Sequence, residues 1–358
     1  MSIKILFLVP YPTNAAPSQR FRFEQYYDVL ATKNIKYATK PFLTQKGWSA
    51  FYKGNVIVIL YYLIIGCFRR ILHLTFLPTA DVVFIHREMI PFGPPIFEWI
   101  IAKIFNKKIV YDFDDAIWLN DPNENNYLVA KLKWKSKVSS ICKWSHKISV
   151  GNLFLADFAK QYNLNVVINP TTIDTSFLHN PANHLGIDKI KKPIIGWTGT
   201  HSTLQYLTPL VPVLKKLETL HDFIFMVIAN KNPEIKLTSF QFKQWKKESE
   251  IADLNCFDIG VMPLTNDKWS SGKCGFKILQ YMALKKPALA SDVGVNSEII
   301  ENDVNGYLCR NQDDWYDYLN LLLKNHDKRA ELGENGRKKI KLKYSVISNS
   351  DNFLGLFV

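Results

Sequence analysis

Lysines, glycines and a glutamine cluster in the stretch GKCGFKILQ, in an arrangement that suits a bound phosphate. Gly275 lets the backbone approach a ligand closely, because glycine has no side chain in the way. From Phe276 the apolar residues recur at helical spacing, so Lys273 and Lys277 flank the start of a helix. A helix amino terminus favours anions, and lysines strengthen that preference. The stretch predicts either a diphosphate site with Gln280 one turn further in, or an ordinary strand–loop–helix unit with solvated lysines.

A second cluster, Asp112 to Asp115, follows the strand-like run Lys-Ile-Val-Tyr111. Open α/β sheets place ligands at strand ends, and three carboxylates in four residues need cations, hydrogen bonds or a metal. Three interpretations stay open. Asp112 and Asp114 hold a divalent cation; or one of them orients or deprotonates an acceptor hydroxyl; or the cluster is structural, capping the next helix and pairing with Arg87 or a lysine.

A glycine-rich turn also occurs in the stretch PIIGWTGTHS, residues 193–202, where a strand runs into a helix start. Backbone N–H groups from Gly199 to Thr203 can hold a β-phosphate there. One such turn is weak evidence by itself. Here it begins a strand–helix series whose later loop carries Lys273 and Lys277, so the two turns together predict a nucleotide site.

The run FDIGVMPL (257–264), followed by KCGFKILQYMALKKPALAS (273–291), resembles the nucleotide-sugar segment of family 4 glycosyltransferases, which have the GT-B fold. The two glutamates typical of that family would fall on Gly272 and Gln280, so both carboxylates are missing. Some branches carry a lysine three residues before the second position, as Lys277 does. VYDFDDAIW and GWTGTHSTLQYL resemble one branch of the family. The resemblance covers most of residues 3–345.

The resemblance implies a retaining glycosyltransferase that moves a sugar from a nucleotide-diphosphate sugar to a glycan or lipid-linked acceptor in surface polysaccharide synthesis. It implies no cofactor and no essential metal. The residues expected to bind the donor are Gly199, Thr200, His201, Lys273, Gly275, Phe276 and Gln280. Those expected to act in catalysis are Asp112, Asp114 and Lys277. Two alternatives stay open, a non-catalytic nucleotide-sugar binder or scaffold in a membrane-associated synthesis complex, and a metal-dependent GT-A-like transferase using Asp112 and Asp114.

Short β-rich runs alternate with helical patterns in both halves of the chain, which is typical of parallel α/β sheets. The 358 residues suffice for two domains. We therefore predict a GT-B architecture with two Rossmann-like doubly wound domains facing a cleft. Residues 1–175 would form the acceptor domain and 176–340 the donor domain, with 341–358 crossing back to the first domain.

The composition is that of a globular protein with a strong positive charge, +13 at neutral pH. Such a charge favours anionic membrane surfaces or phosphorylated substrates, whereas no nucleic-acid-binding module is recognisable. Five scattered cysteines argue against a disulfide framework or zinc site and suit a reducing compartment. The apolar start predicts a strand rather than a signal peptide. We expect a cytoplasmic protein, peripheral on the inner face of the cell membrane.

Two stretches are candidates for membrane contact. Residues 55–77 are the most apolar part of the chain; the run from Val56 to Phe68 is too short to span a bilayer, and Arg69-Arg70 end it. Residues 127–145 predict a basic amphipathic helix. Each suits a helix lying on an anionic membrane, with upstream lysines adding attraction. Each also suits an ordinary element, a core-packed helix in the first case and a solvated helix face in the second.

Overall fold

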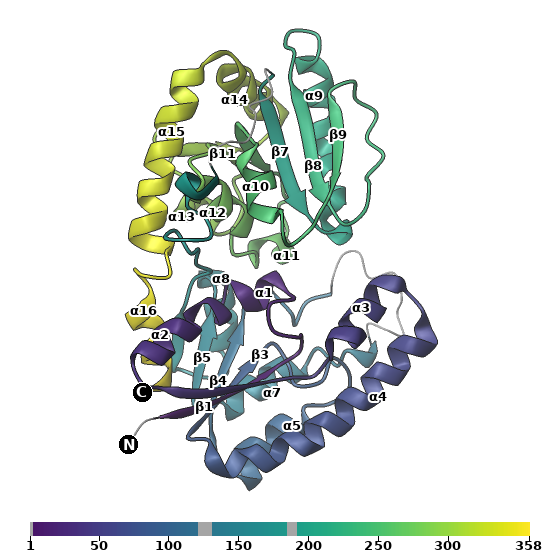
Figure 1. Cartoon of the computed structure of the whole chain (residues 1–358), viewed down its shortest axis with the longest axis vertical. Helices are drawn as coiled ribbons and strands as arrows, with labels where there is room; N and C mark the ends of the chain where they lie inside the picture. The colour runs from purple at the N-terminus through teal and green to yellow at the C-terminus, as the bar shows by residue number, and fades with distance from the viewer. Residues whose placement is uncertain (1–2, 121–130, 185–191) are drawn as a thin grey trace. The chain divides into compact units, whose positions relative to one another are not determined.

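The structure, a computed structural model, describes residues 3–120, 131–184 and 192–358. The chain divides into two compact units. The first comprises Met1–Thr171 and Asn349–Val358, and the second comprises Thr172–Ser348. The domain boundaries predicted from the sequence fell after residues 175 and 340, each within nine residues of the boundaries between these units. Each unit contains one six-stranded parallel sheet (Figure 1).

The sheet of the first unit has the strand order β2-β1-β3-β4-β5-β6, so two halves diverge from its centre as in doubly wound folds. The strands form where apolar residues run together, because both faces of a parallel sheet are covered. Their bounds are β1 Lys4–Val9, β2 Lys36–Pro41, β3 Val82–His86, β4 Lys108–Phe113, β5 Lys147–Val150 and β6 Val166–Ile168. The carboxyl ends of β3 and β4 carry His86 and Asp112, which are register partners.

The helices of the first unit vary widely in length. They are α1 Pro17–Arg20, α2 Tyr27–Thr32, α3 Gln45–Lys53, α4 Val56–His73, α5 Ile96–Trp99, α7 Lys137–Trp144, α8 Leu153–Lys160 and α16 Ser350–Leu354, with shorter or tighter turns at Glu24–Tyr26, Leu74–Thr79, Ile100–Ile104 and Gly355–Phe357. Phe353 stacks on Tyr26 with ring centroids 4.2 Å apart, and Phe357 contacts Phe7 and Phe84. Burial of these rings explains why the last residues belong to the first unit.

Helix α4 begins at Val56, where the Asn55 side chain accepts hydrogen bonds from two backbone N–H groups of the first turn. It packs on α3 and on the segment after β2. Gly66 allows the close contact with Phe42, since a Cβ at Gly66 would lie 2.4 Å from the Phe42 ring. The helix continues through Arg69-Arg70, where the uninterrupted apolar run ends, as far as His73. With its following turn, Val56–Thr79 is long and apolar enough to cross a membrane by length and composition.

The predicted basic helix 127–145 is wrong over part of its length. Its first residues, 127–130, lie outside the described residues. The backbone leaves the helical path around Trp134, which has a positive φ of 51°, and α7 begins only at Lys137. The Lys137 side chain is buried, pairs with Glu88 at 2.6 Å and donates to the Ile90 carbonyl, so it does not belong to a solvated basic face.

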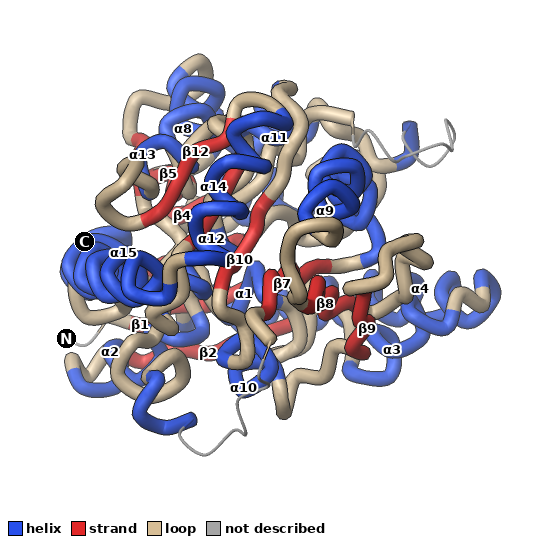
Figure 2. Tube along the Cα trace, turned by 90° about the horizontal axis from the view of Figure 1, so that it is seen from above, coloured by secondary structure: helices blue, strands red, loops and turns tan. Residues whose placement is uncertain are grey.

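The sheet of the second unit has the order β12-β11-β10-β7-β8-β9. Its strands are β7 Ile194–Gly199, β8 Ile224–Ala229, β9 Phe240–Gln244, β10 Ile259–Met262, β11 Ala288–Ser291 and β12 Gly306–Cys309. Its helices are α9 Val211–Leu217, α10 Glu250–Asn255, α11 Lys268–Ser271, α12 Phe276–Ala283, α13 Asn296–Ile299, α14 Gln312–Lys324 and α15 His326–Lys339, with turns at Pro181–His184, His201–Leu210 and Ile340–Tyr344. Helix α12 packs against β10 (Figure 2).

The core of the second unit lies between the sheet and helices α9 and α14. Trp197 of β7, Leu214 of α9 and Leu319 of α14 are among the buried side chains that meet there. Fixing β7 in this core also fixes its carboxyl end, from which Gly199 and Thr200 lead into the predicted phosphate turn. The fold thus places the two predicted donor segments after β7 and after β10, which are neighbours in the sheet.

Candidate functional site

In the second unit, the turn after β7 is tightly held by its own polar groups. Gly199 has no room for a side chain, since a Cβ there would lie 2.4 Å from the Trp197 ring and 2.7 Å from the Thr203 hydroxyl. Thr200 and Thr203 form a reciprocal capping box, and the Thr203 hydroxyl accepts from the Thr200 N–H at 3.2 Å. The His201 N–H donates to Asn230 at 2.7 Å. A phosphate at this turn would have to replace these bonds.

The loop after β10 brings its glycine and lysines to the start of α12. Gly275 stands at the amino end of the helix with φ +66°, and a Cβ there would lie 2.3 Å from the Ile299 side chain. Phe276 begins the helix and is half-buried. The Lys273 ammonium lies 5.0 Å from the centre of the Trp269 ring. The loop geometry therefore depends on glycine at this position, because of its positive φ and its packing against Ile299.

Lys277 connects the two segments. Its ammonium lies 5.5 Å from the centre of the Trp197 ring, the ring that closes off Gly199. The Tyr281 hydroxyl, one turn further along α12, accepts a hydrogen bond from the Thr198 N–H at 3.1 Å. Burial raises the pKa of Tyr281 well above its usual value, so the phenol stays neutral. The structure thus brings the start of α12 to Trp197 and Thr198 of β7, although the two segments are distant in sequence.

Gln280 occupies a different place from the predicted one. Its side chain is fully buried, and its Nε2 lies 3.3 Å from His179 Nε2. Arg337 of α15 donates to the backbone carbonyl of His179 at 2.9 Å and also bonds the carbonyl of Ala283 at the end of α12. In this structure Gln280 faces the segment that enters the second unit and is closed off from solvent.

In the first unit, Asp112 is the centre of a buried network at the ends of β3, β4 and β5. It is ion-paired with Arg22, accepts from Ser149 Oγ at 2.6 Å and lies 2.8 Å from His86 Nδ1. Burial raises the pKa of Asp112, but the charge of Arg22 and the contacts to Arg22 and His86 outweigh it and hold the pKa well below its usual range. Arg22 also bonds the Asn169 carbonyl.

Because Asp112 is fully buried and both of its oxygens are bonded within the protein, it does not face solvent as an acceptor-orienting group would. Sequence reasoning missed Arg22 and His86 as its partners. The only local signal was that His86 follows a strand-like run at a predicted strand end. Nothing near Arg22 in the sequence indicates burial, since arginines are mostly exposed.

Asp114 and Asp115 pair with one arginine. Arg87 donates to Asp114 from Nε at 2.9 Å and from Nη2 at 2.7 Å, and to Asp115 from Nη2 at 2.7 Å. Burial lowers the pKa of Arg87, but the two carboxylates outweigh it and raise that pKa well above its usual range. This is the pairing that the structural interpretation of the cluster named. Both carboxylates remain half-buried, so they still reach the surface of the first unit.

Arg87 is held in an unusual backbone conformation, with φ +58°, which is costly for a residue other than glycine. Its N–H donates to the Asp112 carbonyl at 2.7 Å, and its own carbonyl accepts from the Tyr111 hydroxyl at 2.7 Å. Burial raises the pKa of the Tyr11 phenol, from the loop after β1, although the charge of Arg87 opposes that shift. Strain of this kind persists only where surrounding contacts fix it, and it often marks a functional site.

The metal interpretation finds no support in this geometry. Asp112 faces Arg22 and His86, whereas Asp114 and Asp115 face Arg87, so the carboxylates do not converge on one point. Over residues 3–120, 131–184 and 192–358 there is no group of three or more His, Cys, Asp or Glu side chains placed to hold a metal ion.

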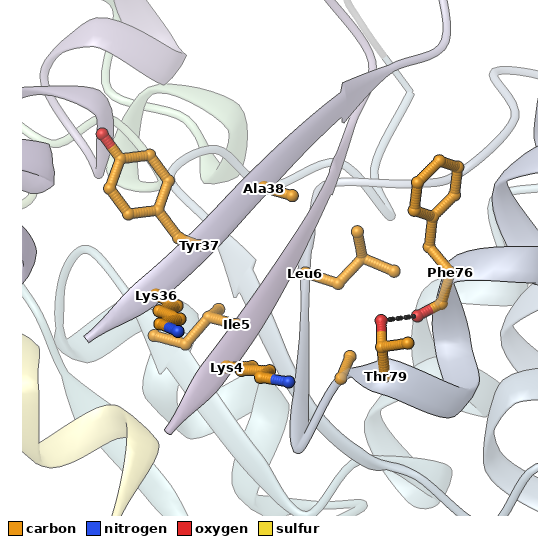
Figure 3. Close-up of a pocket in the computed structure, with 9 residues that line it drawn as sticks. Lys4, Ile5, Leu6, Lys36, Tyr37, Ala38, Phe76 and Thr79 are labelled. Atoms are coloured by element: carbon orange, nitrogen blue, oxygen red, sulfur yellow. Dashed lines mark hydrogen bonds between the residues drawn. The ribbon is translucent and has the colours of Figure 1, made fainter. Parts of the chain in front are cut away.

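A small pocket of about 140 Å³ lies elsewhere in the first unit (Figure 3). Lys4, Leu6 and Ala38 line it from the starts of β1 and β2, and Phe76 and Thr79 close it from the turn after α4. It lies towards the amino ends of these strands, opposite the strand ends that carry His86 and Asp112. We therefore do not assign it to the candidate site.

Comparison with known proteins gives a family match in the second unit. Residues 213–339 match the family model described as glycosyl transferases group 1. A search of curated protein sequences returns no match. The matched range includes Lys273, Gly275, Phe276, Lys277 and Gln280, and the turn at Gly199 lies just before it.

Several solved structures match almost the whole chain. A glycosyltransferase from Rickettsia africae gives a TM-score of 0.65 at 16% identity, covering 99% of this chain and 98% of that one. Sucrose-phosphate synthase from Thermosynechococcus elongatus gives 0.70 at 10%, covering 99% and 98%. The Anabaena protein HepE, in complex with UDP, gives 0.62 at 13%, covering 99% of each chain. These structures confirm the predicted GT-B fold, and the match of residues 213–339 to glycosyl transferases group 1 confirms the enzyme class, a glycosyltransferase. Neither comparison identifies family 4 in particular.

Proposed function

Because residues 213–339 match group 1 glycosyl transferases and the chain has the GT-B fold, we propose that this glycosyltransferase takes its sugar from a nucleotide-diphosphate sugar held by the second unit. The acceptor is a glycan or a lipid-linked glycan, and the reaction retains the anomeric configuration without an essential metal. The product would enter surface polysaccharide. HepE was solved with UDP and with UDP-glucose, which makes uridine nucleotides the first donors to test.

The observation that carries the donor site is the meeting of Lys277 with the end of β7. Cleavage of the donor leaves a diphosphate, and charge that develops on it is stabilised best by cations and N–H groups already in place. Lys277, whose ammonium lies over the Trp197 ring of β7, is such a cation. Gly275 and Phe276 bring the amino end of α12 to the same side, and Lys273 adds a second positive charge.

The remaining donor residues are Thr200, His201 and Gln280, and we propose that they contribute through backbone N–H groups or by supporting α12. The Thr200 and His201 N–H groups would exchange their present bonds with Thr203 and Asn230 for phosphate oxygens. Gln280 supports α12 from its buried side through His179, and it contributes to ribose binding only if its amide turns outward. The missing family glutamates thus leave Lys277 and Lys273 as the principal charged groups.

On the acceptor side we propose Asp114 as the group that orients or deprotonates the hydroxyl. It reaches the surface of the first unit, and Arg87 holds it in one place. Asp112 acts behind it as a positioning residue, since its network joins the ends of β3, β4 and β5. Arg87 connects the two, because its N–H bonds the Asp112 carbonyl and its guanidinium bonds Asp114.

The test is a transfer assay with UDP-glucose and other nucleotide sugars, an acceptor pool of lipid-linked and free glycans, and parallel samples with EDTA. We expect nucleotide release that depends on acceptor, persists in EDTA and gives a product of the same anomeric configuration by NMR. Inversion would contradict the retaining mechanism. Loss of turnover in EDTA, restored by Mg²⁺ or Mn²⁺, would contradict the metal-free mechanism.

A second candidate, a nucleotide-sugar-binding scaffold without turnover, is favoured by one observation. Gly272 and the buried Gln280 stand where the family's two glutamates would fall, so the described donor segment offers no carboxylate to the ribose. Binding of a nucleotide sugar without hydrolysis or transfer to any acceptor would support this function over the enzyme.

A further inference from the structure

Helix α4 presents a continuous apolar surface to solvent. Eight large apolar side chains along it are more than half exposed, and we call them the α4 stripe: Val56, Ile57, Leu60, Tyr61, Ile64, Phe68, Ile71 and Leu72. At 100° per residue they fall within about 160° of the helix circumference. Figure 1 shows α4 running along the first unit as its longest helix. Single exposed apolar residues are common, but a contiguous patch marks an interaction surface.

The opposite side of α4 is attached to the first unit through a buried arginine. Arg70 is fully buried and donates to the carbonyls of Met89 at 2.8 Å, Lys40 at 2.8 Å and Val9 at 2.7 Å. These carbonyls belong to the segments at the ends of β1, β2 and β3. Glu98 of α5 accepts from the Met89 N–H at 2.9 Å, so side chains of α4 and α5 both bond the backbone of Met89.

This attachment decides how α4 can meet a bilayer. Val56–Thr79 would suffice to cross one by length and composition. Crossing would pull Arg70 from three carbonyls and leave a charge in hydrocarbon, which is expensive. A helix lying in the plane of the interface avoids both costs, because Arg70 keeps its bonds while the α4 stripe enters the interface.

The charge of the first unit selects among the possible occupants of this surface. It contains 21 lysine and arginine residues against 12 aspartate and glutamate residues, whereas the second unit contains 24 against 20. Exposed Lys46 lies on α3, which packs on α4, and exposed Lys103 lies just after α5. A second copy of this chain would bring like charges together, whereas an anionic lipid surface is complementary.

We propose that the α4 stripe docks the first unit on an anionic lipid bilayer, with α4 lying in the plane of the interface. Ile96, Trp99 and Ile104, on and after α5, are further exposed apolar residues of the first unit. Docking would hold the enzyme where lipid-linked acceptors are found. The proposal does not rest on the donor site, since binding to vesicles can be measured without nucleotide.

The experiment is flotation of the purified full chain with vesicles of phosphatidylcholine alone or with a third phosphatidylglycerol. We expect binding to the anionic vesicles, weakened by high salt, and little binding to phosphatidylcholine alone. In the triple variant Ile57→Ser, Ile64→Ser and Phe68→Ser, partitioning should fall about tenfold or more, because apolar area that enters the interface is lost. Its thermal midpoint should hold, since all three side chains are exposed.

The matched control replaces three exposed apolar residues of the second unit, Leu220→Ser, Leu342→Ser and Ile347→Ser, and should bind vesicles as the wild type does. Bound wild-type protein should be released by alkaline carbonate, because it lies in the interface. Retention through that wash would overturn the in-plane arrangement. No binding of the wild type to anionic vesicles, or a stable dimer in solution that the triple variant dissociates, would overturn the proposal itself.

Discussion

At the scale of single residues, the charged groups of this chain divide into two kinds. We propose that Lys277 stabilises the charge that develops on a leaving diphosphate, whereas Asp112 is fully enclosed by Arg22, His86 and Ser149. The sequence could show that both positions carry charge at strand or helix ends. It could not show that Asp112 is buried, because Arg22 is 90 residues away in sequence and reaches it only through the fold.

Lys277→Ala should lower turnover about 10²- to 10³-fold, as expected when one preorganised electrostatic group is removed. The thermal midpoint should change little, because the side chain is half-buried at the surface. Initial rates of nucleotide release with acceptor present provide the measurement. Lys268→Ala, an exposed lysine of neighbouring α11, is the matched control and should keep the wild-type rate. Wild-type turnover in Lys277→Ala would remove the lysine from the mechanism.

Asp112→Asn should destabilise the first unit strongly at neutral pH, by about 3–5 kcal/mol, because it leaves the Arg22 charge buried without its partner. The wild-type carboxyl has a depressed pKa in the folded state, so its contribution is present above the unfolded pKa of about 3.9 and fades as the pH falls below it.

Between about pH 5 and pH 3 the wild type should therefore lose about 1 kcal/mol more stability than the variant. Thermal unfolding of both proteins across that range measures the difference. Parallel pH profiles would show that the pKa of Asp112 is not depressed in the folded state, contrary to the network described.

At the scale of elements, apolar runs predicted most central strands, since parallel strands buried on both faces leave a continuous signal. The edge strand β9 was not predicted, because FQFKQ is short, half polar and mostly exposed. Between β1 and β2 the chain forms a 3₁₀ turn followed by α2 rather than one continuous helix, because Arg22 and Phe23 turn inward. Tertiary burial overrides helical periodicity at that point.

The start of α12 gives a prediction at this scale. Gly275→Ala forces a side chain into a positive φ and against Ile299, so it should lower the thermal midpoint of the second unit and weaken donor binding by displacing Lys277. Gly54→Ala is the control, because Gly54 has φ +72° with nothing within 4 Å of its added Cβ. It should carry the same backbone cost and leave donor affinity unchanged. Titration with UDP-glucose compares the two variants. Equal donor affinities in Gly275→Ala and Gly54→Ala would contradict a role of the α12 start in donor binding.

At the scale of the whole molecule, the alternation of strands and helices predicted two parallel α/β units, and the comparisons confirm the fold. The return of the last residues to the first unit rests on Phe353 and Phe357, which bury against Tyr26 and Phe7. Such a return was expected from the family resemblance rather than from local sequence. The composition of α4 alone suited either a core-packed helix or a membrane-bound one. The bonds of Arg70 determine which face of α4 is buried in the first unit.

The most direct test of the account is the thermal midpoint of the wild type and Lys277→Ala with saturating UDP-glucose, or another nucleotide sugar, in EDTA. A ligand that binds the folded state raises the midpoint, by about 5 °C or more near a hundredfold excess over Kd. We predict such a rise in the wild type and a much smaller one in the variant. Equal rises in both proteins, a rise that requires added metal, or no rise with any nucleotide sugar would contradict a donor site built around Lys277.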